Sequence, residues 1–176
     1  MITLSENAHF KIEARILEES SSALLVVSGW VNEDVSLSTV IPMLSDIGTS
    51  VVAFDLSKVT LINSCGVREW LLFIQRMQTK FQCLFTFLNE AIVEQANMIP
   101  NMLGKAGTAV MAFEAPYYCA KCETRQLEVL KPKDINLDQG TFEAPSFSCK
   151  KCSGPMTFDA VEDEYFHFLK HAAQKA

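Results

Sequence analysis

Four of the six cysteines form two Cys-x-x-Cys pairs, Cys119 with Cys122 and Cys149 with Cys152. A two-residue spacing lets one tight turn present two thiolates to one ion, and two such turns supply the four sulfurs of a closed tetrahedral zinc site. This arrangement is more typical of a metal site than of a disulfide framework in a chain without an export signal. We therefore predict one structural zinc ion. Iron and a redox dithiol are the alternatives.

The segment that carries these cysteines has the character of a small module. Pro116 marks its start, and we expect residues 115–176 to form it. Segments 125–130 and 141–148 are predicted to be the two strands of a long hairpin between the cysteine pairs, and 162–175 a closing helix. This pattern resembles a zinc ribbon. A module of this size needs a staple such as a metal to fold.

A second candidate site is the polar tetrad Asn63-Ser64-Cys65-Gly66. An apolar run at 51–54, a polar break at 55–58 and a second apolar run at 59–62 predict strand structure before it. The helical spacing of apolar residues from Val67 to about residue 80 predicts a helix after it. The tetrad therefore lies at a helix N-terminus, where free N–H groups and the helix dipole favour a phosphate, a thiolate or a partner's carboxylate.

The stretch Phe54 to Gly66, FDLSKVTLINSCG, resembles the signature of STAS domains, the fold of bacterial anti-sigma-factor antagonists. The resemblance implies a mixed sheet packed with helices over residues 1–114. It also implies a protein partner, either an anti-sigma factor or a histidine-kinase-like ATPase. The partner would dock on the tetrad and on the start of the following helix, where Arg68 and Glu69 lie. Members of this family are regulators and not enzymes.

In STAS antagonists the residue before the glycine is a serine or threonine that a partner kinase phosphorylates. Here that position is Cys65, and Asn63 replaces the usual aspartate. Three interpretations follow: Ser64 is the phosphoacceptor, Cys65 is a thiol switch, or the surface docks its partner constitutively. We rank the constitutive surface first, because a thiol is no substrate for a serine kinase.

Further elements are predicted from hydrophobic periodicity and turn residues. Residues 1–9 are expected to be a loose start, and Asp34 or Ser36 to cap the first helix. Asn89 is expected to cap a helix that ends near Pro100. The overall prediction is a mixed α/β fold. The remaining predicted elements are strands 10–17, 23–31, 81–88 and 108–113, with a first helix that ends near 47.

Charge and composition narrow the functional classes. The chain has 176 residues and a formal net charge of −6. Residues 1–114 hold seven Lys/Arg against twelve Asp/Glu, and residues 115–176 hold eight against nine. Neither part has the basic excess of a nucleic-acid-binding surface. No apolar run reaches the ~20 residues of a membrane span, and no signal peptide is evident, so a cytoplasmic location is expected.

The sequence contains no glycine-rich phosphate loop, nucleophile elbow or catalytic dyad, so we predict no enzyme activity. His167 and His171 have helical spacing but no evident third ligand. Two alternatives to a STAS-type regulator remain. One is a thiol or redox sensor that acts through Cys65 or the zinc thiolates. The other, by analogy with other STAS proteins, is a small subunit of a lipid-transport ATPase complex. The oligomeric state is left open.

Overall fold

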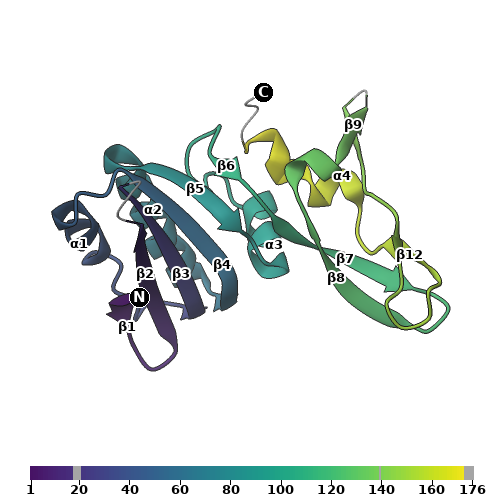
Figure 1. The fold of residues 1–176 in the computed structure, drawn as a ribbon, viewed down its shortest axis with the longest axis horizontal. Helices are drawn as coiled ribbons and strands as arrows, with labels where there is room; N and C mark the ends of the chain where they lie inside the picture. Colours follow the sequence, from purple (N-terminus) through teal and green to yellow (C-terminus); the bar gives the residue numbers. More distant parts are fainter. Residues whose placement is uncertain (18–20, 139, 173–176) are drawn as a thin grey trace.

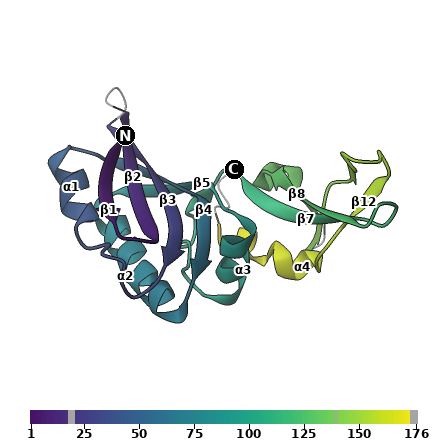
Figure 2. The same cartoon turned by 90° about the horizontal axis from the view of Figure 1, so that it is seen from below.

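The computed structural model describes residues 1–17, 21–138 and 140–172. The chain forms two lobes, one built on a six-stranded sheet and one on a four-stranded sheet, with helix α3 between them (Figures 1 and 2). None of the helices in these residues has both the length and the apolar character needed to cross a bilayer. The predicted mixed α/β class is confirmed at this level.

The first lobe contains a mixed sheet in the order β1-β2-β3-β4-β5-β6. Strands β1 to β3 pair antiparallel, and β3 to β6 pair parallel. The edge strand β1 lies within the segment that was expected to be loose, so that prediction is wrong. The six strands are β1 (Ile2–Glu6), β2 (Phe10–Leu17), β3 (Ser22–Val31), β4 (Val51–Ile62), β5 (Gln82–Phe87) and β6 (Ala109–Val110).

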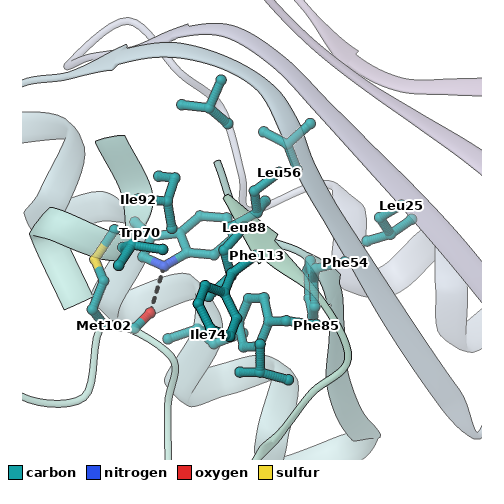
Figure 3. Packing of buried hydrophobic residues seen from close by; sticks show 14 of the residues in the cluster. Leu25, Phe54, Leu56, Trp70, Ile74, Phe85, Leu88, Ile92, Met102 and Phe113 are labelled. Carbon is teal, nitrogen blue, oxygen red and sulfur yellow. Dashed lines mark hydrogen bonds between the residues drawn. The ribbon is translucent and has the colours of Figure 1, made fainter. Parts of the chain in front are cut away.

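Strand β4 runs without interruption through the polar segment 55–58, which separates its two apolar runs. The ladder accommodates these residues through register shifts against β3 and β5. Phe54 lies at the centre of the core that β4 builds, and its ring contacts Trp70 and Phe85 at centroid distances of 5.8 and 5.3 Å (Figure 3). The Trp70 indole N–H donates to the Met102 carbonyl at 2.8 Å, which satisfies the one polar atom of that side chain.

Three helices belong to this lobe: α1 (Val40–Asp46), α2 (Ser64–Lys80) and α3 (Glu90–Met98). The predicted cap Asn89 is confirmed, since its side chain accepts the Ile92 N–H. Asn63 caps α2 in the same way by accepting the Gly66 N–H, which was not predicted. Helix α1 begins later than predicted, with Thr39 at its N-cap. Pro42 fits as its third residue, because an N–H there has no partner within the helix.

The second lobe contains an antiparallel sheet in the order β11-β12-β7-β8. The hairpin predicted between 125–130 and 141–148 is wrong, because β8 pairs with β7. The second segment divides between two sheets, since its first residues form β10, which pairs with β9. The elements are β7 (Phe113–Cys119), β8 (Thr124–Leu130), the 3₁₀ turn Pro132–Asp134, β9 (Asn136–Asp138), β10 (Thr141–Glu143), β11 (Phe147–Ser148) and β12 (Pro155–Phe158).

Strand β7 connects the lobes. Its start continues the first sheet, because the Glu114 N–H donates to the Leu88 carbonyl beyond β5, and its end carries Cys119. It therefore spans position 114/115, where Pro116 suggested a module boundary. An aromatic cluster packs over this junction, in which the Phe166 and Phe168 rings lie 6.1 and 5.2 Å from the Phe113 ring, centroid to centroid.

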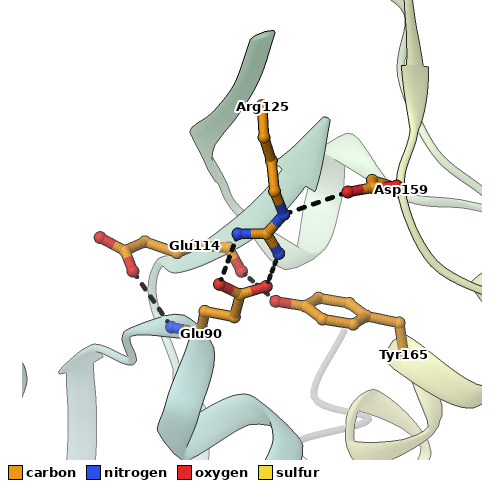
Figure 4. Close-up of polar contacts among 5 residues, drawn as sticks. All are labelled: Glu90, Glu114, Arg125, Asp159 and Tyr165. Atoms are coloured by element: carbon orange, nitrogen blue, oxygen red, sulfur yellow. Dashed lines mark hydrogen bonds and ion pairs between the residues drawn. The ribbon is translucent and has the colours of Figure 1, made fainter. Parts of the chain in front are cut away.

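The closing segment is shorter and less regular than the predicted helix 162–175. It consists of one α turn, α4 (Glu162–Tyr165), and the 3₁₀ turn His167–Lys170. The predicted residues 173–175 lie outside the described residues. The Tyr165 hydroxyl donates to the Glu114 carbonyl at 2.8 Å, which fastens this segment to β7 (Figure 4).

The guanidinium group of Arg125 also links the two lobes. Arg125 of β8 donates through both terminal nitrogens to the Glu90 carboxylate of α3, and through Nε to Asp159 at 3.0 Å (Figure 4). The Glu90 N–H donates to the Glu114 carboxylate at 3.1 Å. These contacts fix the orientation of the small sheet relative to α3.

Candidate metal centre and helix-cap turn

The four cysteines of the two Cys-x-x-Cys pairs converge in the second lobe. Their sulfur atoms all lie within 4.8 Å of one another, with 3.5 Å between Cys119 and Cys152 and between Cys122 and Cys149. A tetrahedral site with metal–sulfur bonds of about 2.3 Å has sulfur–sulfur edges of about 3.8 Å. A disulfide requires ~2.05 Å. The donor set therefore fits one thiolate-bound metal ion, as predicted from the spacing. The arrangement does not show which metal it is.

Two short turns present the ligands. The first follows β7, which ends at Cys119, and returns into β8 through Glu123, whose φ of 52° lies in the left-handed region. In the second, the Cys149 N–H donates to the Gly154 carbonyl, and the Ser153 N–H donates to the Cys149 carbonyl, both at 2.8 Å. These two bonds close the second turn.

Side chains of β8 support the ligands from one face of the strand. Gln126 donates from Nε2 to the Cys149 sulfur at 3.6 Å and accepts the Lys150 N–H at 3.4 Å. The Lys150 ammonium lies 2.7 Å from the buried Glu128 carboxylate. Neither Gln126 nor Glu128 was predicted from the cysteine spacing. The sequence pattern that could have indicated them is the alternation of Thr124, Gln126 and Glu128 directly after the ligand Cys122. In a strand, alternate side chains lie on one face, here the face toward the cysteines.

The thiols differ in acidity. The Lys151 N–H, 3.4 Å from the Cys149 sulfur, is the main cause that lowers the pKa of that thiol to about 6. The Gly154 N–H acts in the same direction on Cys152, but burial and the neighbouring cysteines outweigh it and raise the pKa to about 11. Sulfur atoms this close compete for negative charge, and a divalent cation would stabilise all of them as thiolates.

The predicted tetrad lies at the N-terminus of α2. Asn63 accepts the Gly66 N–H at 2.8 Å and donates to the Glu33 carboxylate at 2.9 Å, which lowers the Glu33 pKa. Ser64 and Cys65 are exposed at the first turn of the helix. The turn is thus held by its ends, and the two residues between them face solvent.

Gly66 is required at the close approach of two backbones. A Cβ atom at this position would lie 2.0 Å from the Val31 carbonyl oxygen, which itself accepts the Asn63 N–H at 3.2 Å. Arg68 is exposed one turn further along α2, and Glu69 is half-buried. The structure therefore brings the predicted docking residues together on one helix end.

The remaining candidates do not form a site. His167 and His171 have ring centroids 5.3 Å apart and are exposed. In the described residues, the four cysteines are the one group of three or more His, Cys, Asp or Glu side chains whose ligand atoms lie close enough to hold an ion. Cys83 is buried in the first lobe, as expected of a core residue.

We compared the chain with protein-family models, with curated proteins and with solved structures, and none of these searches gave a match. The metal-binding geometry of Cys119, Cys122, Cys149 and Cys152, together with a rigid exposed turn at the start of α2, is therefore the basis for a functional assignment.

Proposed function

We propose that this protein is a non-enzymatic regulator that binds a partner protein through the Asn63–Gly66 turn and the outer face of α2. The single observation that carries the proposal is the exposed Ser64–Cys65 pair on a backbone held by Asn63 and Gly66. Pre-ordered loops bind with less entropic cost than mobile ones. The resemblance to STAS domains implies an anti-sigma factor or a histidine-kinase-like ATPase as the partner.

The side chains around the turn support a docking surface. Leu61, just before the turn, is 54% exposed, and Leu72 on the outer face of α2 is 40% exposed. Arg68, one turn before Leu72 on α2, is also exposed. Arginine and large apolar side chains are enriched in protein interfaces.

The local charge favours a constitutive surface over a phosphoswitch. The Glu33 carboxylate already lies 2.9 Å from the Asn63 amide at the helix N-terminus. A phosphate on Ser64 would add negative charge beside this carboxylate, and like charges at close range repel. Asn63 donates a hydrogen bond to Glu33 at this position, where an aspartate would add another negative charge. A partner's carboxylate would bind at the free N–H groups of the first turn of α2.

We further propose that the metal is zinc and that its role is structural. The four thiolates would complete a tetrahedral shell and leave no position for water or substrate. Cys119 and Cys149 are buried, and Gln126 occupies part of the surrounding shell. The ion would cross-link the end of β7 to the turn that follows β11.

A pull-down with matched charge reversals tests the docking surface. Full-length zinc-loaded protein with Arg68→Glu serves as the test bait, and Arg15→Glu as the control. Arg15 is also exposed but lies on β2, away from α2. We expect wild-type and Arg15→Glu to retain the same partner from an extract of the native organism, and Arg68→Glu to lose it. Equal retention by both variants would refute the proposed surface.

A thiol sensor is the second candidate, and the exposure of Cys65 favours it, together with the half-buried Cys122 and Cys152. Peroxide would then oxidise Cys65 or release the metal at low doses. The test is metal release, followed with a chromogenic chelator, in parallel with alkylation of Cys65 measured by mass spectrometry. A Cys65 that stays unoxidised while the metal stays bound rejects the sensor.

A further inference from the structure

The small sheet ends in an unpaired strand, β8, whose outer edge is open. Among the described residues β8 pairs with β7 alone, and it forms the margin of the second lobe (Figure 1). Leu127 and Val129 on this strand are 39% and 56% exposed. Natural proteins usually protect such an edge with charges, prolines or bulges, because its free N–H and C=O groups pair readily with another strand.

Pro116 determines which backbone groups of β8 point outward. It lies opposite Leu127 in the β7–β8 ladder and has no N–H to donate. Its carbonyl accepts the Asp159 N–H at 2.9 Å, and the Glu114 N–H donates to Leu88, so both residues direct their polar groups away from β8. In an antiparallel pair, hydrogen-bonded and non-hydrogen-bonded positions alternate. Arg125, Leu127 and Val129 therefore point their N–H and C=O groups to the open edge.

From this edge we infer that two copies of the chain associate through antiparallel pairing of β8 with β8 about a two-fold axis at Leu127. Leu127 then faces Leu127 of the second copy, and Arg125 faces Val129 of the second copy. Every outward N–H and C=O of these residues gains a partner in this register, and the two four-stranded sheets join into one.

The side chains fit the same register. The exposed leucines meet at the axis, and the aliphatic stem of Arg125 covers Val129 of the second copy, which removes apolar surface from water. Lys131 follows the strand and Glu123 precedes it, so the two-fold pairs these opposite charges twice. Gln126 faces Glu128, and no like charges lie opposite each other within the strand. The sequence of β8 thus favours a second copy over an unrelated strand.

A proline substitution tests the pairing without disturbing the hairpin. The Leu127 N–H points away from β7 and has no acceptor among the described residues, so Leu127→Pro removes an intermolecular bond and preserves the β7–β8 ladder. We expect sedimentation velocity of the metal-loaded full chain to show a concentration-dependent rise from 19.6 kDa to twice that mass. Leu127→Pro should remain at the monomer mass, whereas Met43→Lys, which changes an exposed apolar residue of α1, should dimerise like wild type.

Two further measurements keep the test decisive if Leu127→Pro does not fold. Glu123→Lys should weaken dimerisation at least threefold, and Glu123→Lys with Lys131→Glu should restore it. Hydrogen exchange should slow at the Leu127 and Val129 amides as concentration rises, with Glu128 protected throughout. A monomer at all concentrations would overturn the inference, and so would a dimer of folded Leu127→Pro or exchange protection located on another element.

Discussion

Replacement of Gly66 by alanine tests the geometry of the docking turn most directly. Gly66 lies inside α2, where alanine is better than glycine by about 1 kcal/mol on helix propensity alone. Propensity therefore predicts stabilisation. The structure predicts the opposite, because the added Cβ would lie 2.0 Å from the Val31 carbonyl oxygen and 2.5 Å from its carbon. Both contacts involve backbone atoms, which cannot rotate away as a flexible side chain would.

The size of the effect follows from what must move. Overpacking in a closed region costs about 1–3 kcal/mol, and here β3 or α2 must shift by more than ~1 Å to reach an ordinary contact. The shift also weakens the hydrogen bond from the Asn63 N–H to the Val31 carbonyl, worth about 1 kcal/mol. After the propensity gain, Gly66→Ala should lower the free energy of unfolding by about 2 kcal/mol, or ~4–8 °C in melting temperature at this chain length.

Urea unfolding followed by circular dichroism measures this change, with Gln75→Ala as a control because Gln75 is exposed on the same helix. The control should be neutral or slightly stabilised. Gly66→Ala should unfold at lower urea with an unchanged slope, which reports an effect on the native state. A Gly66→Ala protein as stable as the control would refute the close approach of α2 to the end of β3, and with it the rigid turn.

Three other predictions concern the interlobe contact, the thiols and the metal. Arg125→Met should cost about 1 kcal/mol, since its ion pairs with Glu90 and Asp159 are partly exposed, and salt should reduce the difference in thermal melting. Iodoacetamide should modify Cys65 well before Cys83 in the folded metal-loaded protein, because burial raises the Cys83 pKa to about 12. The raised pKa of Cys83 contributes stability to the folded protein at pH values below about 9, the pKa of this thiol in the unfolded chain. This contribution is lost as the pH rises toward 12, so the melting temperature should fall over that range. Acid or a strong chelator should release one metal ion per chain and lower the melting temperature of the second lobe, as measured by elemental analysis and calorimetry, since protons compete with the metal for the thiolates.

The sequence was sufficient for features that depend on local chemistry. The ligand quartet follows from two spacings, because a two-residue gap permits one tight turn whatever the surrounding fold. The cap Asn89 follows from a side chain that can accept a nearby N–H. These predictions required no knowledge of which segments meet in space, and the structure bears them out.

The sequence alone could not predict which strands pair with each other when they are far apart along the chain. Segment 125–130 has the pattern of a strand whichever neighbour it joins, and the predicted partner 141–148 is also strand-like. The β7–β8 turn at Cys119 to Cys122 decides the outcome, because a short turn brings its own flanking strands together at low entropic cost. The same local pairing places Gln126 and Glu128 against the second cysteine turn, a contact that no spacing rule contains.

Different contacts stabilise the two proposed surfaces, the β8 edge and the α2 turn, and the position of β7 shows why. Its start is bonded to Leu88 of the first lobe, and its end supplies a metal ligand beside β8. A metal ion bound by Cys119 and Cys122 would fix the turn between β7 and β8, next to the strand edge that we infer to dimerise. The contacts that hold the α2 turn come from Glu33 and Val31 in the first lobe. Loss of the metal should thus impair association at β8 while the α2 surface keeps its geometry, so the two interactions can be regulated independently.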